Sequence, residues 1–192
     1  MKYPSTPFIL IGLTFLTAIA GRAADRPLVG LVDEVQELYP DTRLEQPAKR
    51  LSVHTARNTI VGVHVMITGL SGKPVVRFSE AGPDGRPTPG AHWLRLIDVP
   101  VLENTGLDRN TEKYSGKINP FVIRRAPFRV YDPLQPVNSP LTVESPSLTL
   151  RLELPIEATA AAGERLHRLT IDFGDHSETL EFVVTVHRAL VP

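Results

Sequence analysis

The stretch Leu148-Thr149-Leu150-Arg151-Leu152-Glu153-Leu154 decides the fold class of this chain of 192 residues. Leucines alternate with polar residues, which is typical of a β-strand that turns one face to a core. Two further alternating runs follow, and the turn Gly174-Asp175-His176-Ser177 between them predicts a hairpin. The predicted core positions of that hairpin are Leu169, Ile171, Phe173, Leu180, Phe182, Val184 and Val186.

Short β-branched runs precede this closing part of the chain. Strands are predicted at residues 29–35, 51–56, 60–68, 75–79, 92–102 and 121–131, with prolines at 100 and 127 interrupting the last two. The run at 92–102 is therefore expected to be an edge or bulged strand. Residues 36–49, 103–120 and 132–146 are expected to lack regular structure. This pattern predicts an all-β protein, an antiparallel β-sandwich of immunoglobulin-like or jelly-roll-like type with about eight or nine strands.

The first two dozen residues have the features of a targeting segment. Lys2 precedes an apolar run at 8–20, and residues 18–20 and 21–23 both fit a small-x-small cleavage rule. The apolar run is short for a membrane span, so we expect a signal peptide over residues 1–24 and one sandwich domain over residues 25–192. An uncleaved N-terminal anchor is the alternative; a cleaved chain would keep no stable membrane anchor.

Composition indicates the compartment and excludes one class of partner. The chain has no cysteine and no Asn-x-Ser/Thr site, which fits an exported bacterial protein, periplasmic or extracellular, whose core alone stabilises it. Without Lys2 and Arg22, 19 basic residues face 21 acidic ones, a net charge of about −2. Because no basic run is present, we expect no nucleic-acid partner.

Two acidic clusters are candidate metal sites. Asp172, Asp175, His176 and Glu178 surround the predicted hairpin turn, where Asp and Ser are ordinary turn residues. Asp108, Asn110 and Glu112 alternate like the start of a calcium loop, but Lys113 occupies the position that needs glycine. We therefore predict neither a metal nor another cofactor.

His92 and Trp93 are the candidate sugar-contact residues. They adjoin a Pro/Gly-rich turn region, and a tryptophan at the rim of a sandwich can stack on a sugar ring, although tryptophan more often fills the core. Three isolated strand histidines, His54, His64 and His167, are interpreted as packing or surface residues. No Ser-His-Asp or Cys-His arrangement and no nucleophile elbow is found, so no catalytic residue is predicted.

Four segments carry a resemblance to a known family. They are residues 51–58 (Leu-Ser-Val-His-Thr-Ala-Arg-Asn), Asp132-Pro-Leu-Gln-Pro136, the Leu148–Pro155 strand with Ala161-Ala-Gly163, and Val191-Pro192. In this order the chain resembles the N-terminal β-sandwich domain of glycoside hydrolase family 123 and its relatives of unassigned function. Thr59, His64, Arg165 and His167 depart from the family pattern.

The resemblance implies that the chemistry lies elsewhere. In that family a barrel following the sandwich removes N-acetylgalactosamine, so its catalytic residues have no positions in this chain. The first hypothesis is therefore a non-catalytic accessory sandwich of a glycoside-hydrolase-like exported protein, which supports or docks a glycan-degrading catalytic domain. The alternatives are a stand-alone carbohydrate-binding module and a protein-interaction or adhesion sandwich.

Overall fold

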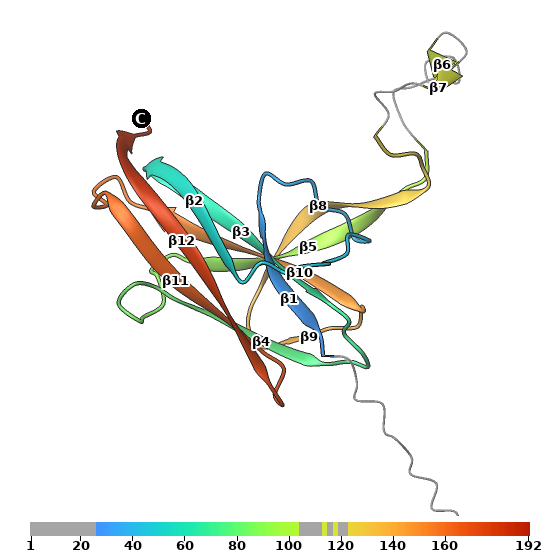
Figure 1. The fold of residues 1–192 in the computed structure, drawn as a ribbon, viewed down its shortest axis with the longest axis horizontal. Helices are drawn as coiled ribbons and strands as arrows, with labels where there is room; N and C mark the ends of the chain where they lie inside the picture. The colour runs from blue at the N-terminus through green and yellow to red at the C-terminus, as the bar shows by residue number, and fades with distance from the viewer. Residues whose placement is uncertain (1–25, 104–112, 115–116, 119–122) are drawn as a thin grey trace, which may run out of the picture.

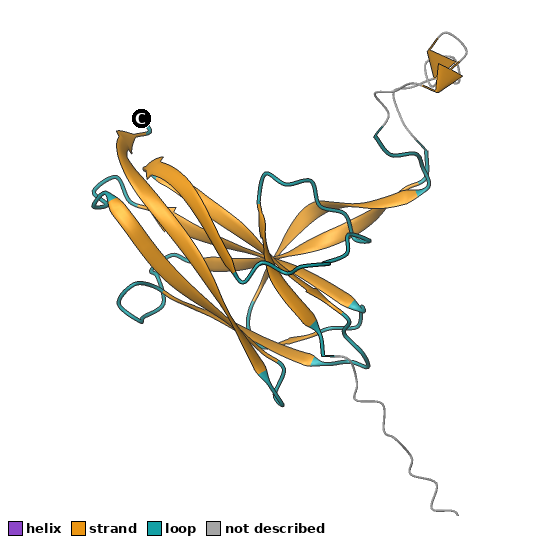
Figure 2. Ribbon diagram, viewed as in Figure 1, coloured by secondary structure: helices purple, strands orange, loops and turns teal. Residues whose placement is uncertain are grey.

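Two five-stranded sheets pack face to face in a computed structural model of the chain (Figures 1 and 2). The structure describes residues 26–103, 113–114, 117–118 and 123–192. The described part contains no helix, and so none that is long and apolar enough to cross a membrane. The predicted all-β sandwich is confirmed. The predicted signal peptide lies outside the described residues.

The first sheet has the order β1-β3-β10-β5-β8, and all its pairings are antiparallel. Its central strand, β10, is the strand that decided the fold class. The strands are β1 (Leu28–Asp33), β3 (Thr59–Thr68), β5 (His92–Val101), β8 (Phe128–Val137) and β10 (Ser147–Ile156).

The second sheet has the order β2-β12-β11-β4-β9. The predicted hairpin is β11 with β12, and its turn is closed by a bond from Phe173 N to His176 O of 2.9 Å. Strand β2 pairs in parallel with β12, whereas the other pairings in this sheet are antiparallel. The strands are β2 (Arg50–Arg57), β4 (Val75–Ala81), β9 (Leu141–Thr142), β11 (Gly163–Asp172) and β12 (Ser177–Leu190).

The core lies between the sheets and is built by alternation. In the first sheet Leu150 lies opposite Val65 and Leu152 opposite Val63, and all four side chains are fully buried. The second sheet contributes six of the seven predicted hairpin positions as buried residues, whereas Phe173 is partly buried at the edge of the core. Each fully buried aliphatic or aromatic side chain contributes about 1.5–3 kcal/mol, which explains how a chain without cysteine forms a stable sandwich.

The proline-rich segment 132–146 contradicts the expectation of irregular structure. Strand β8 continues to Val137 through Pro133 and Pro136, and β9 forms at Leu141–Thr142. Both are edge strands, where a missing N–H can face solvent without breaking the sheet. Strand β5 is bulged as expected, with a register shift between Leu96 and Asp98, but it lies inside the sheet and not at its edge.

A long connection crosses the outer face of the first sheet (Figure 1). We call residues 34–49 the strap. Glu34 forms an ion pair with Arg151 of β10 at 2.7 Å, and Tyr39 packs edge-on against Phe128 of β8 with ring centroids 6.3 Å apart. The returning end bonds to β1 from Leu31 N to Ala48 O at 2.8 Å. As predicted, the strap has no strand of its own. On this side of the sheet His64 and Met66 of β3 and Thr149 of β10 are buried, so both faces of the sheet are partly covered.

The predicted polar loop 103–120 lies largely outside the described residues. Two short strands within it, β6 (Lys113–Tyr114) and β7 (Lys117–Ile118), pair with each other in an antiparallel ribbon.

Candidate functional site

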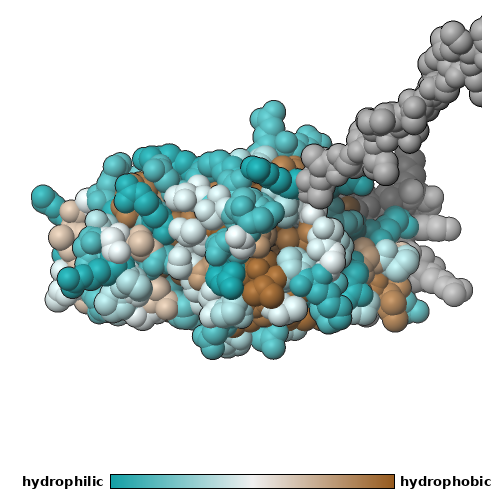
Figure 3. Space-filling model, turned by 90° about the horizontal axis from the view of Figure 1, so that it is seen from below, coloured by the Kyte–Doolittle hydropathy of each residue, from teal (hydrophilic) through white to brown (hydrophobic). Residues whose placement is uncertain are grey.

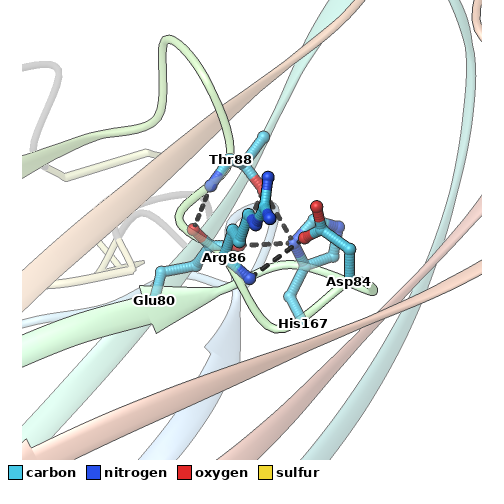
Figure 4. Close-up of polar contacts among 5 residues, drawn as sticks. All are labelled: Glu80, Asp84, Arg86, Thr88 and His167. Atoms are coloured by element: carbon cyan, nitrogen blue, oxygen red, sulfur yellow. Dashed lines mark hydrogen bonds and ion pairs between the residues drawn. The ribbon is translucent and has the colours of Figure 1, made fainter.

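A buried polar cluster joins the second sheet to the loop after β4 (Figure 4). Glu80 lies near the end of β4, His167 in the adjacent strand β11, and Thr88 in loop 82–91. The Nδ1 atom of His167 is 2.7 Å from Glu80 Oε1. Thr88 donates two bonds to the same carboxylate, from its hydroxyl to Oε1 at 2.8 Å and from its backbone N–H to Oε2 at 2.9 Å.

The cluster is almost completely shielded from water. The side chains of His167 and Glu80 are 3% and 2% exposed. Burial alone would raise the pKa of Glu80, but the bonds from His167 and Thr88 outweigh it and lower that pKa below its ordinary value. Glu80 is therefore a carboxylate, and the proton of the His167 contact lies on Nδ1. The Nε2 atom of His167 is buried and has no partner among the described residues.

An acid, an imidazole and a hydroxyl suggest a nucleophilic triad, but this geometry is different. In a triad the hydroxyl faces the imidazole nitrogen that the acid does not contact. Here Thr88 Oγ1 donates to Glu80 and lies 3.4 Å from Nδ1, on the acid's side of the ring. Because the hydroxyl is not activated and the cluster is buried, we assign it a structural role and no catalytic one.

The structural role is to hold loop 82–91 against the sheet. Gly82 begins the loop, and a Cβ atom there would lie 2.9 Å from Thr88 Oγ1 and 3.2 Å from Arg86 O, so only glycine fits without displacement. The loop is closed by a bond from Gly82 N to Arg86 O of 2.7 Å, and Asp84 Oδ1 accepts from Arg86 N at 3.0 Å.

The structure separates the two candidate sugar-contact residues. His92 is exposed on the outer face of β5, where its Nε2 is 3.0 Å from Glu153 Oε2. Trp93 points to the other face, is half-buried, and packs on Phe78 of β4 with ring centroids 5.1 Å apart. Strand alternation thus prevents these neighbours from forming one binding surface. Sugar contact at these residues stays a prediction.

The acidic hairpin residues contact separate partners. Glu178 pairs with Lys49 at 2.8 Å, His176 Nδ1 is 2.8 Å from Asp175, and Asp172 lies 3.8 Å from Arg77. Within the described part of the chain no three His, Asp or Glu side chains converge as metal ligands would. Asp108, Asn110 and Glu112, the calcium-loop candidates, lie outside the described residues.

The strand histidines have three different environments. His54 is exposed and its Nδ1 contacts His187 Nε2 at 3.0 Å. His64 is buried beneath the strap, where burial and then the nearby Arg151 lower its pKa to about 4, whereas Asp33 opposes this shift. His167 belongs to the buried cluster. His54 is a surface residue and His64 a packing residue, but the contact of His167 with Glu80 was not predicted from the sequence.

Strand parity could have revealed that contact. Glu80 continues the alternating core face of Val76 and Phe78, and His167 continues the face of Leu169 and Ile171. A buried polar side chain needs a hydrogen-bond partner, so two such residues at core positions are candidates for a mutual contact. The sequence did not reveal that β4 and β11 are neighbours.

A second candidate site is the C-terminal corner, which we define as Arg57, Asn58, Ile60, Leu190 and Val191. The Nδ2 atom of Asn58 donates to Val191 O at 3.0 Å, and Val191 N donates to Arg57 O at 3.1 Å. Asn58 adopts a left-handed conformation with φ of 56°, which asparagine tolerates better than most residues. Two of the motifs that carried the family resemblance, Arg57-Asn58 and Val191-Pro192, are therefore in contact.

The corner also exposes apolar side chains. Ile60 is 60% exposed, Leu190 59% and Val191 42%. Figure 1 shows the chain end beside the end of β2. Exposed apolar side chains are a feature of surfaces on which another protein packs.

Comparisons with known proteins support the fold. No family model and no curated protein sequence matches the chain. Among solved structures, a family 123 glycoside hydrolase from Clostridium perfringens, studied for glycolipid glycan hydrolysis, is similar with a TM-score of 0.60 at 12% identity. The match covers 87% of this chain, and this chain spans 28% of that enzyme.

Two weaker similarities were found. The N-terminal domain of PorA matches with a TM-score of 0.32 at 10% identity, over 84% of this chain and 99% of that one. A chain of the CaDoc0917–CaCohA2 complex matches with a TM-score of 0.28 at 19% identity, over 72% of this chain and 99% of that one. Scores this low carry no functional argument. The similarity to the hydrolase shows that the chain shares a fold with part of that enzyme.

Proposed function

We propose that the chain is a non-catalytic accessory β-sandwich of a glycoside-hydrolase-like protein and that it docks a glycan-degrading catalytic domain. The observation that carries the proposal is the similarity to 28% of the family 123 hydrolase over nearly all of this chain. The C-terminal corner supports it, because the motif residues Asn58 and Val191 hold the last strand in a fixed position beside exposed apolar side chains.

The role does not depend on a catalytic site in this chain. The one acid–imidazole–hydroxyl cluster found among the described residues is buried, and its hydroxyl faces the wrong atom for nucleophilic attack. We also propose export to the periplasm or the cell exterior, on the basis of the apolar run at residues 8–20.

Binding calorimetry tests the docking role. The purified chain is titrated with a family 123-type catalytic barrel from the same organism, and both proteins are assayed for hydrolysis of an aryl N-acetyl-β-galactosaminide. We expect saturable binding that is lost in Ile60→Lys with Leu190→Lys. Leu134→Lys is the matched control, because Leu134 is 46% exposed on β8, away from the corner. Turnover by the chain alone, or absence of binding, would overturn the proposal.

A further inference from the structure

A wedge opens in the first sheet where two neighbouring strands separate. Strands β5 and β10 pair only from His92 opposite Glu153 to Arg95 opposite Leu150. Beyond this point β5 continues with β8 to Val101, whereas β10 continues with β3 to Ser147 (Figure 1). The facing edges of the two strands border a hollow of about 200 Å³.

A bulge directs one side chain into this hollow. Because the register between β5 and β8 shifts after Leu96, Tyr131 and not Asp132 lies opposite Asp98. The Tyr131 hydroxyl then reaches across the wedge to Thr149 Oγ1 at 3.0 Å. Bulges commonly re-aim side chains beside functional sites. Burial raises the pKa of Tyr131, and the hydrogen bond with Thr149 opposes this shift, so the hydroxyl stays neutral and able to donate.

The lining combines hydroxyls with one uncompensated cation. Ser147 and Thr149 line the wedge from β10, and Tyr131 lines it from β8. Arg95 also lines it, and its guanidinium has no hydrogen-bond or ion-pair partner among the residues that the structure describes. Asp98 is already paired with Arg129, so it does not neutralise Arg95. Pro40 of the strap and the side chain of Leu96 supply apolar surface.

We propose that the wedge binds one acidic sugar residue, whose carboxylate pairs with Arg95 and whose hydroxyls bond to Ser147 and Tyr131. The hollow holds the volume of roughly seven water molecules, which suits one sugar ring and not a longer glycan. Guanidinium–carboxylate pairing is strong and directional, and the proline and leucine surfaces suit the apolar face of a sugar ring. The inference is independent of the proposed docking role, because the wedge contains no residue of the C-terminal corner.

Titration of the full chain with D-glucuronate tests the inference, with D-glucose as the neutral counterpart and acetate as the bare carboxylate. For a ligand of this size we expect a dissociation constant on the order of 1 mM. D-glucose and acetate should each bind at least about tenfold more weakly. Arg95→Gln should reduce glucuronate binding to the level of glucose. Arg77→Gln, an exposed change on β4 of the other sheet, should bind like the wild type.

Three results would overturn the inference: glucose binding as tightly as glucuronate, acetate binding as tightly as glucuronate, or unchanged binding in Arg95→Gln. If the Arg95→Gln variant does not fold, chemical-shift mapping of glucuronate binding to the wild-type chain tests the inference instead. Shifts at Leu96, Tyr131 and Ser147 support the wedge, and shifts elsewhere overturn it. Because the docking test measures association with a protein, its failure would leave this result intact.

Discussion

The side-chain amide of Asn58 donates a hydrogen bond to the carbonyl oxygen of Val191, across 133 residues of sequence. The bond joins the turn between β2 and β3 to the end of β12. It fixes the direction of the chain at the corner where exposed Ile60 and Leu190 lie. A position that is both strained and bonded in this way can be tested by substitution.

Asn58→Ala should lower the free energy of unfolding by about 1–2 kcal/mol, because alanine loses the bond and does not tolerate the left-handed conformation. Asn58→Gly should cost less, because glycine adopts the left-handed conformation without strain, although it also loses the side-chain hydrogen bond. Urea unfolding measures both. Equal stability of the alanine variant and the wild type would contradict this account of the corner.

Glu80→Ala should destabilise the fold by about 3–5 kcal/mol, because it leaves His167 and the donors of Thr88 buried without a partner. Loop 82–91 should then loosen and expose Arg86 to trypsin. Limited proteolysis and urea unfolding check the two effects. Asp84→Ala is the control within the same loop, since it removes only the bond to Arg86 N. A Glu80→Ala chain as stable and as trypsin-resistant as the wild type would refute the structural role.

The stability of the fold should fall in mild acid because of His64. The pKa of this imidazole is about 4 in the folded chain and about 6.5 when unfolded, so the unfolded chain binds more protons between these values. Stability is therefore complete above pH 6.5, and about 3 kcal/mol is lost as the pH falls to 4. Glu80, whose pKa is lowered in the folded chain, adds to the loss once the pH falls below the ordinary value of 4.5, because the unfolded chain then binds its proton first.

Unfolding measured from pH 7 to pH 4 checks this dependence. His64→Leu should flatten the slope, and His54→Gln, a change at an exposed histidine, should retain it. If the free energy of unfolding depends on pH equally in the wild type and in both variants, groups other than His64 cause the loss of stability.

Trp93→Ala should destabilise the sandwich by about 2 kcal/mol or more, because its half-buried ring packs on Phe78 between the sheets. His92→Ala should cost about 0.5 kcal/mol, since it removes two exposed contacts, one with Glu153 and one with the carbonyl oxygen of Gly90. Thermal unfolding separates the two residues. Reversed magnitudes would mean that the orientation of β5 is wrong.

The strands were predictable where alternation and turn chemistry agree. Leu148 to Leu154 and the hairpin around Gly174 combine a clear core face with a clear turn, and both form as expected. The extension of β8 through Pro133 was missed because proline disfavours a strand only where its missing N–H is needed, and edge position is a property of the whole sheet.

The candidate sites were less predictable because they depend on which strands are neighbours. Glu80 and His167 occupy core positions in their own strands, but their contact needs the pairing of β4 with β11. The wedge beside Arg95 needs the separation of β5 from β10, which no local pattern encodes. Asn58 and Val191 belong to two of the segments that carry the family resemblance, but no local pattern predicts their contact.

Hydrogen exchange of the chain with and without a catalytic barrel tests the docking role most directly. The account predicts slower exchange on binding for the amides of residues 57–60 and 188–191, and unchanged exchange in the strap at residues 34–49. Protection confined to the strap or to other strands, or no protection when the barrel is present at saturating concentration, would contradict the proposal that this corner docks a catalytic domain.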